Sequence, residues 1–418
     1  MNLVDSEINK LTKVIVHCPD EGIERITPKR AEELLFDDIV YLPKMVEEHN
    51  VFRYILEAFI GKDNVLEISD LLLESLNVND KLKTEVLQMI IDDAELPQST
   101  MTMLEGLSHD RLTQVLITGY HEKEDHILFD PIPNFIFTRD IAVTVRDHII
   151  ITKANKEARQ RENFLTRFIF AAHPLFSEQA GKLINLNDVE LFPPSKKGEK
   201  VSIEGGDIMI IEKDYLLVGC SERTTNHAFH ALKDALFAKG VIKHVVQINI
   251  PPDRSFMHID TLFTRVNKNE IVCYKPIIYD GLGSNVLMYS QNAEMKSFGS
   301  VKDFFLSEIN PNMKFIFSGM GMTPYQEREQ WTDGCNLVCV KPGVGITYDR
   351  NVMTAKAFEK AGYTMMSADA FLQEVNKDPN FPNTITNTII TIPSGELSRA
   401  RGGSHCMTCP IERVIAHA

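Results

Sequence analysis

The stretch RGGSHCMTCP (residues 401–410) ends eight residues before the C-terminus and combines two cysteines, a histidine, an arginine and two glycines. A C-x-x-C pair is typical of three kinds of site: a redox couple, half of a metal site, or one reactive thiol beside an inert one. The other cysteines and the polar motifs elsewhere in the chain bear on the choice between them.

Cys335 and Cys339 are the natural partners for a four-thiol zinc site built on the C-terminal pair. They flank a strand-like segment, however, which puts their sulfur atoms ~13 Å apart, too far to share one zinc ion. A thioredoxin-like pair would lie at the start of a helix after an early strand, whereas this pair follows a glycine-rich loop near the end of the chain. The pattern favours one activated thiol, which needs a base and a group that orients the base.

Composition narrows the class of protein. The chain has 418 residues, of which 44% are hydrophobic and 24% charged, so it can bury a large core and is too long for one ordinary domain. The N-terminus MNLVDSEINK is unlike a signal peptide, and no apolar run approaches the ~18 residues of a membrane span. We therefore expect a globular, cytoplasmic protein.

Charge and cysteine count agree with that expectation. Seven cysteines are an odd number without a disulfide framework, which fits a reducing compartment. A net charge of −14 argues against nucleic acid or an anionic membrane as a partner, because phosphate binding needs a basic face. A small cationic substrate suits an acidic protein.

Short apolar runs that alternate with turn residues predict many strands. Helical patterns fall between some of them, at 158–173 and at 226–240, where Gly240 ends the pattern. From 69 to 125 the apolar residues recur at helical spacing, and four polar residues there are N-cap candidates. The sequence therefore predicts a mixed α/β chain with a small helical insertion. The expected strands lie at 13–18, 141–145, 148–152, 207–211, 215–219, 261–266, 270–274, 314–318 and 336–340, and the N-cap candidates are Ser69, Asn79, Ser99 and Ser108.

Three polar motifs each allow two interpretations. In PNFIFTRD (133–140), Asp140 closes a strand-like FIF, but taken alone the motif favours a turn with a surface ion pair. In IEGGD (203–207), Glu204 precedes two glycines, which permit close approach of the backbone or a simple turn. In MHIDTLF (257–263), His258 and Asp260 would share one face of a strand, ~6.6 Å apart, either as a solvated face or as a catalytic pair.

These motifs supply candidates for the groups that an activated thiol requires. His258 can act as the base, and Glu204 or Asp260 can orient its ring. His405 is adjacent to Cys406 in the chain and suits the role less, because neighbouring side chains in an extended segment point in opposite directions.

Six motifs, taken together and in order, resemble the bacterial arginine deiminases: PNFIFTRD, EGGD, ERTTNHA, MHIDTLF, EREQWTDGCN and RGGSHCMTCP. TPKRAEELLFDD (27–38) extends the similarity towards the N-terminus, so that it covers nearly the whole chain. The resemblance implies the guanidine-modifying, or pentein, fold, a five-bladed α/β propeller of ββαβ units. It further implies a catalytic domain over residues 1–418 interrupted by a helical domain at 69–125, a homo-oligomer (dimer or tetramer), and no metal or organic cofactor.

The resemblance also implies an activity, the hydrolysis of L-arginine to L-citrulline and ammonia through a covalent amidino-thioether. In this family pattern Cys406 matches the nucleophile and His258 the general acid/base. Glu204 matches the carboxylate that holds the histidine, and Asp140 and Asp260 match the pair that binds the substrate guanidinium.

Five further positions match the family's substrate-binding residues. Asn134 and Phe137 correspond to residues that line the pocket. Arg159, Arg223 and Arg401 correspond to residues at or near the carboxylate end of the substrate.

Two departures from the family pattern leave alternatives open. Ala400 stands where the family usually has glycine, and residues 141–157 look unlike the usual version. The competing functions are the same chemistry on another guanidine such as agmatine or a methylated arginine, an amidinotransferase, a catalytically weak arginine-binding protein, and a metal or thiol-redox module, which the cysteine spacing disfavours. Arg223 and Arg401 favour a substrate with a free α-carboxylate.

Overall fold

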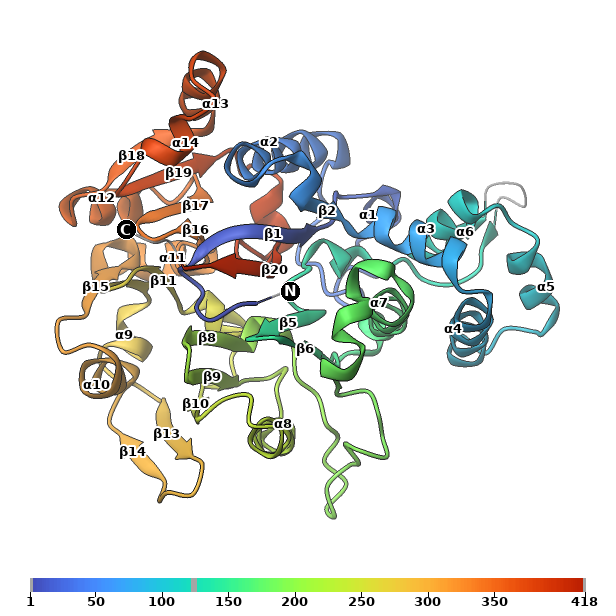
Figure 1. The fold of residues 1–418 in the computed structure, drawn as a ribbon. Helices are drawn as coiled ribbons and strands as arrows, with labels where there is room; N and C mark the ends of the chain where they lie inside the picture. The colour runs from blue at the N-terminus through green and yellow to red at the C-terminus, as the bar shows by residue number, and fades with distance from the viewer. Residues whose placement is uncertain (1–2, 122–125, 416–418) are drawn as a thin grey trace.

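A computed structural model describes residues 3–121 and 126–415. Residues 122–125, the end of the expected helical insertion, lie outside this range. The chain is a mixed α/β protein whose strands gather in several small sheets (Figure 1). Within the described ranges, no helix is both long enough and apolar enough to cross a bilayer.

One pattern of pairing recurs in the sheets: two antiparallel strands, a helix, and a strand that returns parallel to the second strand. A helical crossover of this kind is the usual way to join parallel neighbours. The first such unit along the chain contains β5 (Ala142–Val145), β6 (His148–Ile151), α7 (Gln160–Ala172) and β7 (Leu183–Asn185). The second contains β8 (Ile208–Glu212), β9 (Tyr215–Cys220), α8 (Asn226–Ala238) and β10 (His244–Asn249).

The next two units keep the pattern with additions. In the third, β15 runs parallel to β12, while β13 and β14 extend the sheet of the second unit. Its elements are β11 (Phe263–Asn267), β12 (Glu270–Cys273), α9 (Lys275–Ile278), β13 (Asn285–Ser290), β14 (Lys296–Phe298), α10 (Val301–Phe304) and β15 (Lys314–Phe317). The fourth unit follows α11 (Tyr325–Trp331) and contains β16 (Val338–Lys341), β17 (Val344–Tyr348), α12 (Val352–Lys360), β18 (Thr364–Ser367), α13 (Ala368–Lys377), α14 (Phe381–Thr384) and β19 (Thr388–Ile392).

The fifth unit joins the two ends of the chain. β20 (Cys409–Val414) pairs antiparallel with β1 (Lys10–Val16), with Ile15 opposite Cys409, and β2 (Val65–Glu67) returns parallel to β1. The crossover is α2 (Leu42–Ile60), a long helix that the sequence analysis did not predict. In Figure 1 the β1–β20 pair lies between the fourth unit and β5–β6, so the C-terminal strand is held in the middle of the molecule.

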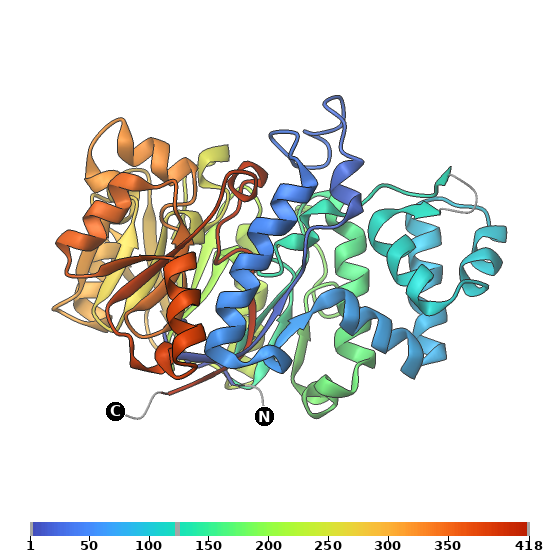
Figure 2. The same cartoon turned by 90° about the horizontal axis from the view of Figure 1, so that it is seen from above.

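The helical segment lies to one side of the sheets (Figure 2). Its helices are α3 (Ile68–Val78), α4 (Asp80–Asp93), α5 (Ser99–Glu105) and α6 (His109–Thr118), with α1 (Glu21–Glu24) beside it and the short pair β3 (Tyr120–His121) and β4 (His126–Ile127) after it. Their apolar side chains form one continuous cluster with those of α7, β5 and β6. The N-cap positions of Asn79 and Ser108 are confirmed, and those of Ser69 and Ser99 are wrong because both lie inside the first turn of a helix.

Two local predictions around the polar motifs are also wrong. Phe135 and Ile136 of the FIF segment lie in a 3-10 turn (Pro133–Ile136), and Phe137 follows it. His258 precedes another 3-10 turn (Ile259–Thr261), after which β11 begins at Phe263. His258 and Asp260 therefore do not share one face of a strand. Contacts with other units set their relative position instead.

Candidate active site

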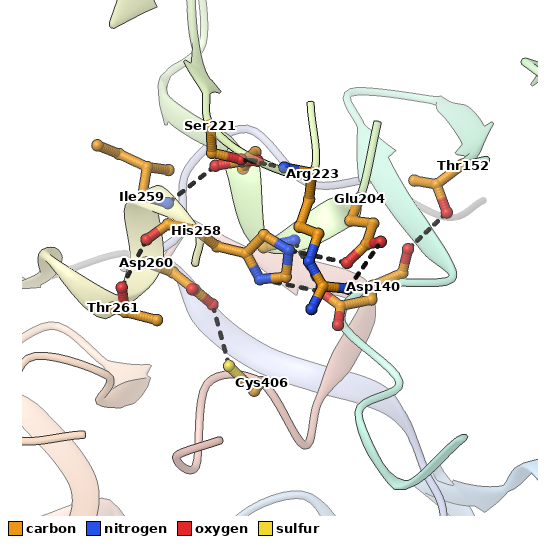
Figure 3. A network of polar contacts seen from close by, with 12 residues as sticks. Asp140, Thr152, Glu204, Ser221, Arg223, His258, Ile259, Asp260, Thr261 and Cys406 are labelled. Atoms are coloured by element: carbon orange, nitrogen blue, oxygen red, sulfur yellow. Dashed lines mark hydrogen bonds and ion pairs between the residues drawn. The ribbon is translucent and has the colours of Figure 1, made fainter. Parts of the chain in front are cut away.

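Each of the five units carries a buried polar side chain just before its first strand. Asp140 precedes β5, Glu204 precedes β8, Asp260 precedes β11, Asn336 precedes β16 and Cys406 precedes β20, each by two to four residues. These turns meet, so residues that are far apart in sequence form one buried polar site (Figure 3).

His258 lies between two carboxylates in this site. Its Nε2 is 2.9 Å from Oε2 of Glu204, and its Nδ1 is 3.7 Å from Oδ1 of Asp140. Burial alone would lower the pKa of the imidazole, but the charge of Asp140 and the hydrogen bond with Glu204 outweigh it and raise the pKa to about 10. At neutral pH the ring is an imidazolium that can donate a proton.

Glu204 remains ionised although it is fully buried. Burial opposes its charge, but the Arg159 guanidinium, 3.2 Å from Oε2, and the bond to His258 hold the pKa of Glu204 well below its usual range. Arg223 adds a second positive charge, 3.6 Å from Oε1. The carboxylate is therefore a fixed anion that keeps the imidazole protonated and oriented.

The Cys406 thiol lies on the other side of the site and points towards Asp260 (Figure 3). Sγ donates to Oδ2 of Asp260 at 3.4 Å and accepts from Nδ2 of Asn336 at 3.1 Å. Burial, followed by the nearby carboxylates Asp260 and Asp140, raises the pKa of the thiol well above its ordinary value. Without a positively charged ligand, Cys406 is a thiol at neutral pH.

Asp260 has one bonded oxygen and one that is free. Oδ2 lies 2.9 Å from Nδ1 of His405, whereas Oδ1 is buried and has no hydrogen-bond partner among the described residues. Although burial opposes ionisation, His405 lowers the pKa of Asp260. A buried carboxylate oxygen without a donor is costly, and a cationic ligand with N–H groups would satisfy it.

Glycines allow the turns to approach one another this closely. A Cβ on Gly206, in the EGGD motif, would lie 2.7 Å from Nδ1 of His258. A Cβ on Gly402, in the C-terminal motif, would lie 2.2 Å from Cε1 of Phe137. Both motifs therefore require glycine because another part of the site occupies the place of a side chain.

Arg159 does not present a free guanidinium. Its Nη1 is 2.7 Å from Oδ2 of Asp140 and 3.2 Å from Oε2 of Glu204, and its Nη2 is 2.8 Å from Oε2 of Glu162. Burial raises the pKa of Glu162 to about 7, although Arg159 opposes the shift. Arg159 thus occupies Asp140, one of the two carboxylates expected to bind a substrate guanidinium.

Arg223 and Arg401 lie in different surroundings. Arg223 is buried beside Glu204 and lines a cavity of about 720 Å³ together with Asn155. Arg401 has a positive φ of 63°, stacks on the Trp331 ring at 3.3 Å and pairs with Asp37 at 3.4 Å. The structure therefore brings Arg159 and Arg223 together at Glu204 and places Arg401 elsewhere, on Asp37 and Trp331.

Asn134 and Phe137 are both buried at the edge of the site. The Asn134 side-chain amide donates to the Leu34 backbone carbonyl at 2.8 Å, and the backbone carbonyl of Asn134 accepts from Arg159 at 3.4 Å. These bonds connect the site to the segment 27–38, whose similarity to the family was noted above.

One potential ligand atom from each of Asp140, Glu204 and His258 lies within 4.8 Å of the other two, a spacing that could hold a metal ion. The Arg159 guanidinium already supplies a positive charge there, because it forms ion pairs with Asp140 and Glu204. The cluster fits an ion-pair network at least as well as a metal centre.

Comparison with known proteins identifies the family. The family model "Arginine deiminase" matches residues 32–413. The chain belongs to the arginine deiminase family. Arginine deiminases from Listeria monocytogenes and from Borrelia garinii subsp. bavariensis are 31% and 30% identical to it, each over 98% of this chain and 97% of the relative.

More distant proteins share the fold of this family member. The N-terminal domain of ArgZ, an arginine dihydrolase from cyanobacteria, superposes with a TM-score of 0.52 at 15% identity, covering 96% of this chain and 97% of that one. A DDAH from Pseudomonas aeruginosa, in complex with citrulline, gives 0.50 at 13% identity, covering 96% and 99%. Because these two proteins are only 15% and 13% identical to this chain, the comparison shows a shared fold and no more.

Sequence reasoning did not identify three buried polar residues in this deiminase: Glu162, Asp207 and Asn336. Asp207 accepts hydrogen bonds from Ser221 and from the backbone N–H of Ile259, which fixes the turn that carries His258. Asn336 ends the quoted EREQWTDGCN motif and is the first residue of the strand expected at 336–340, so a polar residue at the start of a strand was the available signal.

Proposed function

We propose that this chain hydrolyses L-arginine to L-citrulline and ammonia, with Cys406 as the nucleophile. The observation that carries the proposal is the buried Cys406 thiol beside Asp260, which has an unpartnered oxygen, in a member of the arginine deiminase family. A guanidinium is planar and cationic, so it can satisfy that oxygen and offer its carbon to Sγ.

Substrate binding requires a rearrangement of Arg159. Asp140 and Asp260 are the carboxylates proposed to bind the substrate guanidinium. In the structure, Asp140 forms an ion pair with Arg159 instead. The incoming guanidinium replaces this contact, and Arg159 then becomes available to the carboxylate end of the substrate. The bound cation also offsets the carboxylate charges that raise the pKa of Cys406, so the thiol releases its proton to solvent and becomes a nucleophile.

The first half of the reaction forms a covalent intermediate. Sγ attacks the guanidinium carbon to give a tetrahedral adduct, and His258, an imidazolium held by Glu204, donates its proton to the departing nitrogen. The C–N bond breaks and ammonia leaves. An amidino-thioether remains on Cys406.

The second half uses the same groups. The neutral imidazole of His258 takes a proton from water, whose oxygen attacks the amidino carbon. The C–S bond then breaks, which releases citrulline and regenerates Cys406. This route needs neither a metal nor an organic cofactor.

Arg223 and Arg401 are the proposed ligands of the substrate carboxylate, with Asn134 and Phe137 lining the pocket. Arg401 reaches it by leaving Asp37 and Trp331, which a closing movement of the loop around Gly402 and Gly403 would allow.

The wider predictions stay proposals. The five-unit pattern of pairing supports a five-bladed propeller, and the position of α3–α6 supports a helical domain inserted at 69–125. We further propose a cytoplasmic homo-oligomer, which light scattering would test.

The activity is tested by incubating purified protein with L-arginine and assaying citrulline and ammonia. We expect both in equal amounts, and neither from Cys406→Ser. Formation of neither product by the wild-type enzyme would contradict the proposal. A methylated arginine and an amidino acceptor, tested alongside, would reveal a related hydrolase or an amidinotransferase.

A further inference from the structure

Asn336 occupies, in the fourth unit, the position that the other units fill with Asp140, Glu204, Asp260 and Cys406. It lies two residues before β16, and its side chain is completely buried. This position places an uncharged, buried amide in a site that also contains carboxylates, a histidine, a thiol and the guanidinium groups of Arg159 and Arg223.

Two backbone contacts determine which way this amide faces. Its Oδ1 accepts from the backbone N–H of Cys406 at 3.1 Å, and its Nδ2 donates to the backbone carbonyl of Asp260 at 3.2 Å. A backbone N–H can only donate and a carbonyl can only accept, so the amide cannot be flipped without losing both bonds. It is therefore Nδ2–H that lies 3.1 Å from Sγ of Cys406.

We infer that Asn336 is a further catalytic residue, whose side-chain amide donates a hydrogen bond to Sγ of Cys406 and stabilises the attacking thiolate. The role rests on the proposed function, because it concerns the same nucleophile. A hydrogen bond to an anion is stronger than one to a neutral group, so the contact favours the thiolate over the thiol.

The charges around Sγ explain why such a donor matters. Asp260, Asp140 and Asp333 all oppose a negative charge on the sulfur, and a backbone hydrogen bond from Gly403 favours it. On Asp260 itself, His258 and His405 act from two further segments. Asn336 adds a donor without adding a positive charge, so it does not compete with a substrate guanidinium for Asp140 and Asp260.

The same contact accounts for a glycine of the C-terminal motif. A Cβ on Gly403 would lie 2.6 Å from Oδ1 of Asn336. The turn before Cys406 is thus shaped around this amide, which supports a built contact between the fourth and fifth units.

Two variants distinguish the loss of the Asn336 hydrogen-bond donor from the loss of the side-chain shape. Asn336→Asp keeps the side-chain shape and an acceptor for the Cys406 N–H but replaces the donor, and Asn336→Ala removes both. Asn351→Asp is the matched control, since Asn351 is buried and its Nδ2 donates to the Thr332 carbonyl at 2.9 Å, away from Cys406. Thermal melts establish which variants fold.

The measurement is the rate at which iodoacetamide alkylates Cys406 in the absence of arginine, followed by peptide mass spectrometry from pH 7 to 9. Loss of one donor to a charged acceptor should raise the thiol pKa by about one unit, so both Asn336 variants should alkylate about tenfold more slowly at each pH. Their kcat/KM for arginine should fall about 10- to 100-fold. The Asn351 variant should match the wild type.

Folded Asn336 variants that alkylate at the wild-type rate would overturn the inference, even if their turnover fell, because Asn336 would then only position the loop. Alkylation uses no arginine. A wild-type enzyme that makes no citrulline would therefore overturn the substrate assignment, while the comparison of alkylation rates would still decide whether Asn336 stabilises the thiolate.

Discussion

Cys406 and Cys409 are three residues apart but have different surroundings. Cys406 contacts Asp260 and Asn336, whereas Cys409 begins β20 and its sulfur donates to the Ala142 carbonyl at 3.2 Å. We expect Cys406→Ala to abolish citrulline formation while still binding arginine in calorimetry. Cys409→Ala should keep most of the activity, and an equal loss in both variants would restore the redox interpretation of the C-x-x-C pair.

Glu204 is expected to control the charge of His258. Glu204→Gln keeps a hydrogen-bonding oxygen but removes the anion, so the pKa of His258 should fall from about 10 towards 6.5. An NMR titration of the imidazole measures the shift directly. The alkaline limit of kcat should move to lower pH in parallel, and a His258→Ala enzyme with full activity would contradict the acid/base role.

The raised pKa of His258 also makes the stability of the folded protein depend on pH. Because the pKa of His258 is raised above 6.5 in the folded protein, its protonation stabilises the fold fully below about pH 6.5. This contribution is lost as the pH rises through about 10. Glu204→Gln should therefore flatten the decrease in thermal stability over that interval.

At the scale of elements, the turns before the first strands carry the chemistry, and Gly206 tests how tightly they fit. Gly206→Ala would place a methyl group 2.7 Å from Nδ1 of His258, so the ring must move away from Glu204 or Asp140. We expect a fall in kcat of about 100-fold or more with a folded protein. Gly181→Ala is the control, since nothing lies within 4 Å of its Cβ and its activity should be unchanged.

The Arg401 loop is expected to set substrate choice. Agmatine lacks the carboxylate that Arg223 and Arg401 would bind, so the enzyme should favour arginine on the order of 10³-fold in kcat/KM. Arg401→Ala should reduce this ratio, mainly by impairing arginine. Equal kcat/KM values for the two guanidines in the wild type would contradict the proposed carboxylate site.

Several elements were predictable because their pattern is local. The strands expected at 13–18 and 215–219 and the helical pattern at 226–240 were predicted from apolar runs and a glycine stop signal, and they overlap β1, β9 and α8. His258 and FIF were assigned to strands because a short apolar run does not distinguish a strand from a 3-10 turn. The ion pairs of Arg159 and the contact of Asn336 join segments far apart in sequence, so no local pattern could predict them.

At the scale of the whole molecule, the site lies where five units of similar pairing meet. The units share the position of their polar residue but not its type, which is Asp, Glu, Asp, Asn or Cys in chain order. Because the sequence shows no repeat, the pattern becomes visible only in the structure. The β1–β20 pair brings Cys406, the proposed nucleophile, next to Arg139, Asp260 and Asn336 of the first, third and fourth units.

The most direct test of this account is to mix wild-type enzyme with L-arginine, quench in acid within milliseconds, and map the peptides by mass spectrometry. We expect a transient adduct on Cys406, equal in mass to arginine less one ammonia, that decays as citrulline appears. An adduct on another residue, or citrulline formation without an adduct on Cys406, would contradict it.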